Sequence, residues 1–112
     1  MPKTKKTELL QQGTLELLVL RLLQSGEMNG WDIMQRIRLL SGEVLSVTPG
    51  ALYPALHRLQ DRDLVAAGWG ASDNNRRAKF YRLTAAGRKQ LDAERKTWSQ
   101  FSGAIESLLR DA

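Results

Sequence analysis

The sequence predicts a mainly α-helical domain with one small β-hairpin, and three observations carry this prediction. Apolar residues recur at helical spacing in three stretches before residue 62. Two strand-like stretches, 64–69 and 77–83, then flank a turn-rich segment, which is typical of a β-hairpin. A last periodic stretch, 85–110, is predicted to be one long helix. Three helices followed by a hairpin with a basic second strand form the winged helix-turn-helix arrangement, in which the hairpin is the wing.

Length and composition bound the class of protein. The chain has 112 residues, of which 42 % are hydrophobic, and this fits one domain with a modest core. It has no cysteine, so disulfides and cysteine-based metal sites are excluded. No apolar run approaches the ~20 residues of a membrane span, and the basic start lacks a signal-peptide pattern. We therefore expect a cytoplasmic protein with a basic arm at 1–9, a winged helix-turn-helix domain at 10–83 and a C-terminal dimerisation helix at 84–112.

The positive charge of the chain is unevenly placed. The net charge is +5 and the isoelectric point is near 10.0. Residues 1–13 carry three lysines and one glutamate, and residues 76–82 carry four positive side chains and no acid. A basic patch is typical of a surface that binds phosphate, although it also occurs on proteins that are merely soluble. The arm could follow a nucleic-acid backbone or act as a solubilising tail, and the sequence leaves both open.

The first two helices are predicted at 12–25 and 29–40. Leucine and valine at i, i+3, i+4, i+7 and i+8 mark the first helix, which Gly26 ends. Asn29 is a suitable N-cap for the second helix, and Asp32 three residues later resembles a capping box. The apolar side of the second helix is expected to comprise Trp31, Ile33, Met34, Ile37 and Leu40.

The third helix is predicted from Thr48 to about Arg62. Thr48 can cap the first free N–H groups with its side chain, and Pro49 suits the first helical position. The face expected to be buried comprises Leu52, Ala55, Leu56 and Leu59. The outward side, close to the N-terminus, comprises Gly50, Tyr53, Pro54 and His57. Such a helix can enter a DNA major groove, but an ordinary amphipathic core helix shows the same pattern.

The second strand of the hairpin is expected to be basic. Strand alternation places Ala78, Phe80 and Arg82 on one face, and Arg77, Lys79, Tyr81 and Leu83 on the other. Arg76, Arg77 and Lys79 cluster at the tip and on the return strand, where they are candidates for phosphate contacts. Solvated charges on an exposed hairpin are the alternative.

The last helix is predicted over 85–110, with Thr84 as its cap, and spans about 40 Å at 1.5 Å per residue. Its apolar residues follow heptad-like spacing, although Glu94 interrupts the seam. Such a stripe must be buried, either against the first helix or against a second copy of this helix, and we expect a homodimer that uses both. The residues assigned to an effector or dimer interface are Trp98, Phe101, Ile105 and Leu108.

Four segments resemble the PadR family of bacterial transcriptional regulators in its short form. They are Gly13-Thr14-Leu15, Asn29-Gly30-Trp31-Asp32-Ile33, the stretch 48–59 and the stretch 76–87. The Leu-Tyr-Pro-x-Leu-x-Arg-Leu core and the Tyr-x-Leu-Thr-x-x-Gly end of the wing are specific, and the resemblance covers about residues 10–90. Trp31 departs from the family pattern, where a tyrosine is expected, but it keeps an aromatic ring.

The resemblance implies a homodimeric repressor that binds double-stranded DNA at an inverted-repeat operator. By that resemblance, the residues of the third helix that face DNA are Thr48, Gly50, Tyr53, Pro54 and His57. The wing residues that reach phosphates or the minor groove are Arg76, Arg77 and Lys79. The resemblance also implies a small, often aromatic, effector.

The chemistry of these side chains limits how DNA is read. The third helix has no Asn or Gln in its first turns, so we expect limited direct readout, with apolar or phosphate contacts from Tyr53 and Pro54. His57 could donate to a phosphate or a purine, or could make no contact. Arg58 leans to the side of the helix and could brace the fold by pairing with an acid. If two last helices cross near their middles, Trp98 and its symmetry mate could form a slot for a planar effector, or could simply fill the dimer core.

An enzyme is not expected. One histidine, no cysteine and no paired carboxylates at a recognisable spacing leave no general acid–base, cofactor or metal site. The favoured function is a sequence-specific DNA-binding regulator. The alternative is a winged-helix module that binds a protein or RNA partner without sequence-specific DNA readout.

Overall fold

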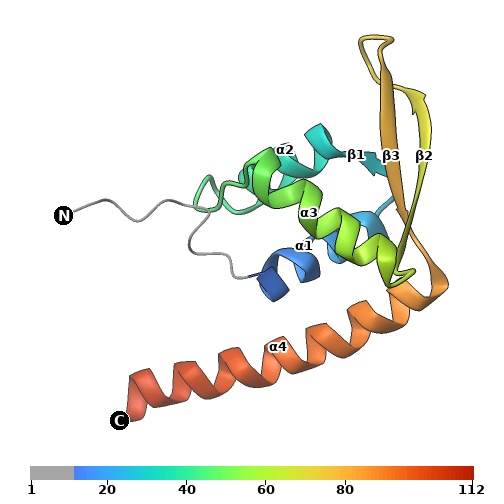
Figure 1. The fold of residues 1–112 in the computed structure, drawn as a ribbon. Helices are drawn as coiled ribbons and strands as arrows, with labels where there is room; N and C mark the ends of the chain where they lie inside the picture. Colours follow the sequence, from blue (N-terminus) through green and yellow to red (C-terminus); the bar gives the residue numbers. More distant parts are fainter. Residues whose placement is uncertain (1–11) are drawn as a thin grey trace.

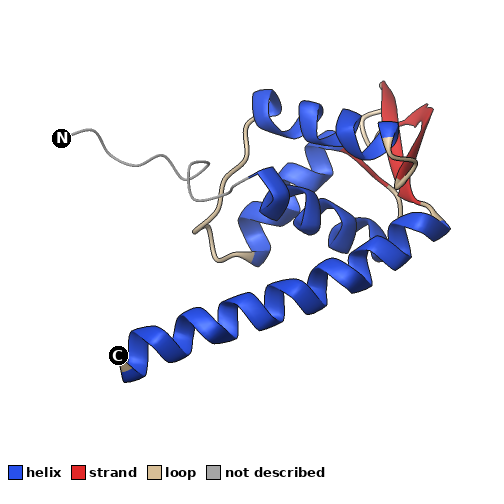
Figure 2. Cartoon of the chain, turned by 60° about the horizontal axis from the view of Figure 1, so that its bottom comes forward, coloured by secondary structure: helices blue, strands red, loops and turns tan. Residues whose placement is uncertain are grey.

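The structure, a computed structural model, describes residues 12–112. The elements are, in order, α1 (Gln12–Gln24), β1 (Met28–Asn29), α2 (Gly30–Leu40), α3 (Pro49–Asp61), β2 (Val65–Ala71), β3 (Arg77–Leu83) and α4 (Ala85–Asp111). The first three helices form a bundle, the β2–β3 hairpin projects from one end of it, and α4 runs beneath as a long rod (Figures 1 and 2). The predicted winged helix-turn-helix fold with a long C-terminal helix is confirmed. The basic arm predicted at 1–9 lies outside the described residues.

One hydrophobic core lies where the three-helix bundle meets the base of the sheet. The side chains with no exposed surface are Val19 and Leu20 of α1, Ile33 of α2, Leu52, Ala55, Leu56 and Leu59 of α3, and Leu91 of α4. The predicted buried face of α3 is therefore confirmed. Because this face is held in the core, the opposite side of α3 must point to solvent.

The start of α2 agrees with the sequence prediction, but the placement of two of its apolar residues does not. Asn29 Oδ1 accepts a hydrogen bond from the Asp32 backbone N–H at 2.9 Å, so the predicted N-cap is confirmed. The prediction that Trp31 and Leu40 join the apolar side is wrong, because 64 % of Trp31 and 69 % of Leu40 are exposed. Trp31 turns towards the hairpin, and Leu40 borders an open cleft between α1 and α2. Helical spacing predicts which residues share a face, but it does not predict whether a neighbouring element extends far enough to cover all of them.

Thr48 occupies the predicted N-cap position of α3 without the predicted side-chain bond. Its backbone is extended, but its hydroxyl makes no capping hydrogen bond. The Thr48 carbonyl instead accepts the N–H groups of Ala51 and Leu52, at 3.1 and 2.9 Å. Pro49 has no N–H group to satisfy, so fewer donors at this end need a partner.

The hairpin is longer than predicted and gains a third strand. β2 pairs with β3 from Val65↔Leu83 to Ala71↔Arg77, so the first strand starts one residue later than expected and runs to 71. β1 pairs with β3 through Met28↔Tyr81, and the strand order is β1-β3-β2. Two residues are too few to show alternation, which explains why β1 was not predicted. The alternation expected of β3 is confirmed, because Tyr81 and Leu83 are buried while Arg82 is exposed.

α4 is fixed to the domain at its first turns. Thr84 Oγ1 accepts from the Gly87 N–H at 3.0 Å, as predicted, and donates to the Asp63 carbonyl at 2.7 Å. A Cβ atom at Gly87 would overlap the Leu64 carbonyl and lie 2.7 Å from Leu83 Cδ1, so only glycine allows this approach. Beyond Leu91 the helix runs along α1 and is mostly exposed. Among the described residues, no helix is long and apolar enough to cross a membrane.

Candidate nucleic-acid interface

A groove of about 640 Å³ separates the outward side of α3 from the hairpin. The N-terminus of α2 forms its end, and the Tyr53 and His57 side chains of α3 form one wall. We call it the basic groove, and its lining is Asn29, Gly30, Trp31, Tyr53, His57, Trp69, Ser72, Asn74, Arg76, Arg77, Ala78, Lys79 and Tyr81. Three of these residues are cationic and, among the described residues that line it, none is acidic. The groove therefore favours an anionic partner.

Tyr53 is held against the backbone of α2. A Cβ atom at Gly30 would overlap the Tyr53 hydroxyl and lie 2.8 Å from its Cζ atom, so any larger residue here would force the Tyr53 ring to move. The glycine thus lets the aromatic ring lie directly on the first turn of α2. Burial raises the pKa of the nearby Tyr81 phenol, and the Tyr53 hydroxyl raises it further. A tyrosine is neutral near pH 7 in any case, and this shift keeps Tyr81 neutral to a higher pH, so it adds no negative charge to the groove.

Two cations of the wing lie over aromatic rings. The Arg77 guanidinium carbon is 4.5 Å from the centroid of the Trp69 ring, on the neighbouring strand. Lys79 Nζ lies 5.9 Å from the centroid of the Tyr81 ring. Trp69 is 62 % exposed, so its ring packs against the Arg77 guanidinium rather than into the core. Stacking of this kind orders a charged side chain without neutralising it.

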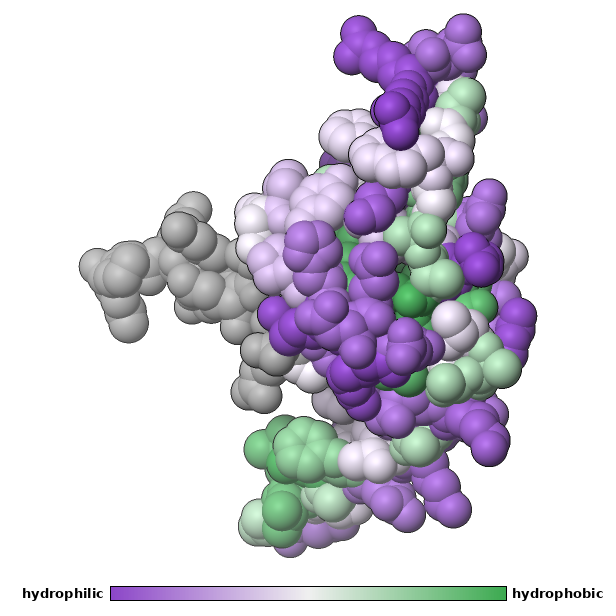
Figure 3. Space-filling view, turned by 45° about the vertical axis from the view of Figure 1, so that its right-hand side comes forward, coloured by the Kyte–Doolittle hydropathy of each residue, from purple (hydrophilic) through white to green (hydrophobic). Residues whose placement is uncertain are grey.

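The wing ends in a tight polar turn that presents these cations. The Ser72 N–H donates to the Arg76 carbonyl at 2.8 Å, and the Ser72 hydroxyl donates to the same carbonyl at 3.0 Å. Asn75 adopts a left-handed conformation with φ of 59°, which asparagine tolerates better than most residues. Figure 3 shows hydrophilic side chains gathered at this tip, at the top of the view. This turn therefore holds Arg76 and Arg77 at the far end of the hairpin.

A second surface, on the distal half of α4, is apolar. Its exposed residues are Trp98, Phe101, Ile105, Leu108 and Leu109, which we call the α4 stripe. The rings of Trp98 and Phe101 lie 6.1 Å apart at an interplanar angle of 40°. Hollows of about 360 and 440 Å³ lie on the two sides of Trp98, against α1. Figure 3 shows hydrophobic side chains gathered at the bottom of the view, on α4.

The model of the family described as Transcriptional regulator PadR-like family matches residues 19–93. This chain belongs to the PadR-like family of transcriptional regulators. A transcriptional regulator of Mycobacterium tuberculosis is 33 % identical over 101 residues, which cover 90 % of this chain and 84 % of that protein. The negative transcriptional regulator PadR of Bacillus subtilis is 29 % identical over 77 residues, or 69 % of this chain, and the match spans 42 % of its length. The crystal structure of a PadR-like regulator from Bacillus cereus is 26 % identical, covers 90 % of this chain and 96 % of its own, and superimposes with a TM-score of 0.77.

The resemblance to the PadR family noted in the sequence is thus confirmed, and the fold places the predicted residues in two groups. The predicted residues that line the basic groove are Tyr53, His57, Arg76, Arg77 and Lys79. Thr48, Gly50 and Pro54 are exposed at the N-terminal end of α3 but do not line the groove. These three residues lie towards the N-terminus of α3 and outside the groove that faces the wing.

Some residues of the groove escaped sequence reasoning. Trp31 was assigned to an apolar helix face and Trp69 to a strand, and neither was considered as part of a site. Asn29, Ser72 and Asn74 were read only as cap and turn residues. The signal that could have found the tryptophans is that Trp31 stands next to Asp32 and that Trp69 stands between two glycines, Gly68 and Gly70, which offer no side chains to pack against it.

Arg58 braces the fold, the role that its place on the side of the helix had suggested. Its Nε atom donates to Glu16 Oε1 at 2.7 Å, across from α3 to α1. Arg62 Nη1 lies 3.7 Å from the other oxygen of the same carboxylate. Glu16 is buried, and it is the one charged residue so placed within the described part of the chain. The cation nearest the middle of α3 therefore points into the domain and not into the groove.

Proposed function

We propose that this PadR-family protein is a homodimeric repressor that binds double-stranded DNA through α3 and the wing and is released by a small aromatic effector. The basic groove is the observation that carries the DNA-binding part, because it brings the outward side of α3 opposite three wing cations. The relative from Bacillus subtilis is named a negative regulator, which supports repression rather than activation.

In this proposal the exposed N-terminal end of α3 enters the major groove of an operator. Thr48, Gly50 and Pro54 lead the helix, and Tyr53 and His57 follow along its outward side. The wing then lies over the adjacent backbone, where Arg76, Arg77 and Lys79 contact phosphates or the minor groove. Since α3 offers no amide or arginine for bidentate base contacts on this side, specificity depends in large part on DNA shape.

The α4 stripe is proposed as the dimer interface. Large exposed apolar residues on one helix face are unfavourable in water, and a second copy of the same helix would cover them. A two-fold symmetric pair would present two copies of α3 to DNA, which requires an inverted repeat with half-sites spaced by about one helical turn. On this proposal, residues 84–112 act as the dimerisation segment.

The hollows beside Trp98 are proposed as the site of a planar aromatic effector. Trp98 and Phe101 supply apolar walls suited to stacking. Glu94 also lines one hollow, and its buried Oε2 atom has no hydrogen-bond partner among the described residues. An effector or a second copy that offers a hydrogen-bond donor would satisfy this atom. Filling of the dimer core by Trp98 is the alternative role.

The first test is binding to DNA from upstream of the protein's own coding sequence. Fluorescence anisotropy would compare this duplex with a scrambled duplex of equal length at two salt concentrations. Preference for the upstream duplex that survives the higher salt supports a sequence-specific regulator. Equal and salt-sensitive binding to both duplexes contradicts it and favours a winged-helix module with a protein or RNA partner.

A matched pair of variants tests which face of the wing meets DNA. Arg77 lines the basic groove, whereas Arg82 is exposed on the opposite face of the same strand. Arg77→Gln is expected to reduce the slope of log affinity against log salt by about 0.9, as the loss of one phosphate contact does. Arg82→Gln is expected to leave the slope unchanged. Equal slopes for the two variants would place DNA elsewhere.

A second matched pair tests the dimer. Leu108 of the α4 stripe and Leu39 of α2 are 63 % and 62 % exposed, so a charge at either site perturbs the isolated chain to a similar extent. Leu108→Asp is expected to give monomers in analytical ultracentrifugation, while Leu39→Asp keeps the dimer. A dimer that withstands Leu108→Asp contradicts association through the stripe.

A further inference from the structure

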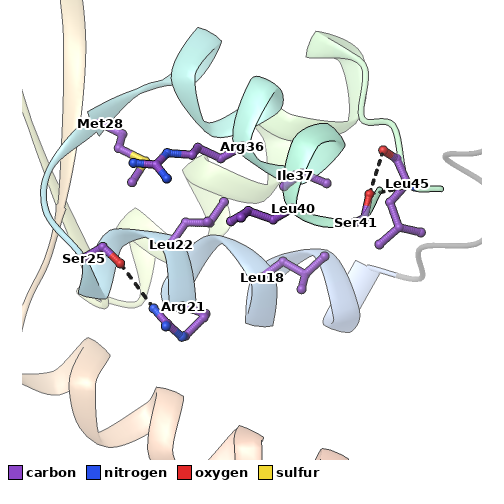
Figure 4. A pocket seen from close by; sticks show the side chains of 10 residues that line it. All are labelled: Leu18, Arg21, Leu22, Ser25, Met28, Arg36, Ile37, Leu40, Ser41 and Leu45. Carbon is purple, nitrogen blue, oxygen red and sulfur yellow. Dashed lines mark hydrogen bonds between the residues drawn. The ribbon is translucent and has the colours of Figure 1, made fainter. Parts of the chain in front are cut away.

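A separate cleft of about 460 Å³ opens between α1 and α2 (Figure 4). Leu22, Met28 and Ile37 form its floor and are all buried in the core. Leu18, Leu40 and Leu45 form its edges, and Leu40 is left largely exposed there. The volume falls in the range of small-molecule pockets, and the walls are predominantly aliphatic.

Among the described residues that line this cleft, the charged side chains are two arginines. Arg36 extends from α2 across one end, with its guanidinium beside the Met28 side chain (Figure 4). Arg21 lies at the edge on α1, where it donates to the Ser25 hydroxyl at 3.3 Å. Within the described residues neither arginine has a carboxylate partner, although Arg38, Arg58, Arg62 and Arg110 all do. An aliphatic cleft with unpaired cations at its rim is complementary to an amphiphilic anion.

We infer that this cleft binds a small amphiphilic anion, with its apolar body on Leu22, Met28 and Ile37 and its carboxylate or similar oxyanion on Arg36, assisted by Arg21. A guanidinium presents several N–H donors in a plane, which suits the oxygens of such a head group. The apolar body would cover Leu40 and Leu18, which otherwise border open water. The site differs from the proposed aromatic slot in place and in the ligand chemistry that it favours.

The cleft is joined to the basic groove through α2. Ile37, Arg36 and Leu40 line the cleft, and the first residues of the same helix, Gly30 and Trp31, line the groove. Met28 of the cleft also pairs with Tyr81 of the wing. Because Gly30 lies directly against the Tyr53 ring, a small displacement of α2 must move Tyr53 or the helix that carries it. An anion wedged between α1 and α2 is therefore expected to change DNA affinity, and this second part rests on the proposed DNA-binding function.

The cleft continues towards Trp98, so the test must separate the two sites. Leu18, Arg21 and Leu45 line both the cleft and one of the hollows beside Trp98. Arg36 and Ile37 line only the cleft. A substitution at Arg36 therefore reports on the cleft alone, and a substitution at Trp98 reports on the neighbouring slot.

The experiment titrates the full chain with decanoate by calorimetry, in the absence of DNA. 1-Decanol and decyltrimethylammonium are the matched neutral and cationic probes. We expect decanoate to bind and the two other probes to bind at least tenfold more weakly, because only the anion bonds to guanidinium groups. Equal binding of all three probes, or no binding of decanoate, overturns the inference.

Variants then locate the bound anion. Arg36→Gln is expected to weaken decanoate binding about tenfold. Arg38→Gln, two residues away on α2 and outside the cleft, should leave binding within about twofold. Loss of binding with Trp98→Ala but not with Arg36→Gln would assign decanoate to the aromatic slot and overturn the inference. A further outcome is that decanoate binds only after Leu108→Asp has separated the two copies. This would show that a second copy covers the cleft, and it would also overturn the inference.

The link to DNA is measured separately. Saturating decanoate is expected to weaken binding of the preferred duplex at least threefold in the unsubstituted protein and not in Arg36→Gln. Failure of the proposed function would appear as absence of duplex preference without decanoate. Failure of the inference would appear in the calorimetry, whatever the duplex result. Decanoate binding with unchanged DNA affinity would overturn the regulatory part.

Discussion

Replacing Arg58 by methionine tests whether the cation in the middle of α3 holds the fold or contacts DNA. Arg58 Nε donates to Glu16 Oε1 at 2.7 Å, and only 9 % of the Glu16 side chain is exposed. The Arg58 side chain is 37 % exposed, so water screens part of the interaction. Losing one partner of a buried pair destabilises a protein by roughly 3–5 kcal/mol, whereas exposed pairs contribute about 0.2–1 kcal/mol. Between these limits, we expect Arg58→Met to lower the free energy of unfolding by about 2 kcal/mol.

The remaining cation keeps the loss below the value for a fully buried pair. Arg62 Nη1 stays 3.7 Å from Glu16 Oε2 and offsets part of the uncompensated charge. Glu16→Met removes that charge altogether. The double variant should therefore be less destabilised than the sum of the two single variants, by about 1–2 kcal/mol. Urea unfolding at one fixed protomer concentration measures these values, since self-association would otherwise shift them.

Measurements of DNA binding distinguish a structural role of Arg58 from a direct contact between Arg58 and DNA. At a temperature where Arg58→Met is fully folded, its salt slope on the preferred duplex should equal that of the unsubstituted protein. Arg77→Gln serves as the variant whose slope is expected to change. Unchanged stability together with a slope reduced by about 0.9 would refute the reasoning, because Arg58 would then contact a phosphate.

Three further predictions follow from contacts in and near the basic groove. Trp69→Ala removes the ring beneath Arg77 and should weaken DNA binding about twofold to fivefold, with partial recovery in Trp69→Phe; equal affinities in fluorescence anisotropy would show that the stack is irrelevant. Gly30→Ala should displace Tyr53 and weaken DNA binding while changing the free energy of unfolding by less than about 1 kcal/mol, because the side chain can swing outward; unaltered anisotropy would contradict this. Burial, and to a lesser extent Tyr53, raises the pKa of Tyr81, so its stabilising contribution is full below the ordinary pKa of about 10 and is lost as the pH rises towards the raised value. Urea midpoints from about pH 8 to about pH 11 should thus fall more steeply for the unsubstituted protein than for Tyr81→Phe, and parallel curves would exclude this cause.

Most of the fold could be predicted because its signals are local. The caps at Asn29 and Thr84, the buried face of α3 and the alternation in β3 each depend on residues within a few positions. The charge of the wing follows in the same way from four cations within seven residues. Where a local rule failed, as for the Thr48 hydroxyl, the Thr48 carbonyl accepts the Ala51 N–H group that the hydroxyl could have capped.

About half of the candidate site could not be predicted, because it depends on contacts between residues that are far apart in the sequence. The basic groove joins Trp31 of α2 with Trp69 of the wing, and periodicity had assigned both to structural faces. The partner of Arg58 lies 42 positions away, so the acid could be expected but not named. The α4 stripe was evident from spacing, whereas the hollows beside Trp98 require α1 at its side.

The sequence by itself therefore determined the helices, the wing, the direction in which α3 faces and the sign of the charge that the wing presents. Hydrogen bonds and side-chain periodicity over one or two turns are enough to specify these features. Only the tertiary structure decided that Gly30 carries the Tyr53 ring, that Arg58 is held by Glu16 and that a cleft lined by Arg21 and Arg36 separates α1 from α2. These features depend on the distances and angles between packed elements, and such geometry is set by the shape of the whole core rather than by any one stretch of the chain.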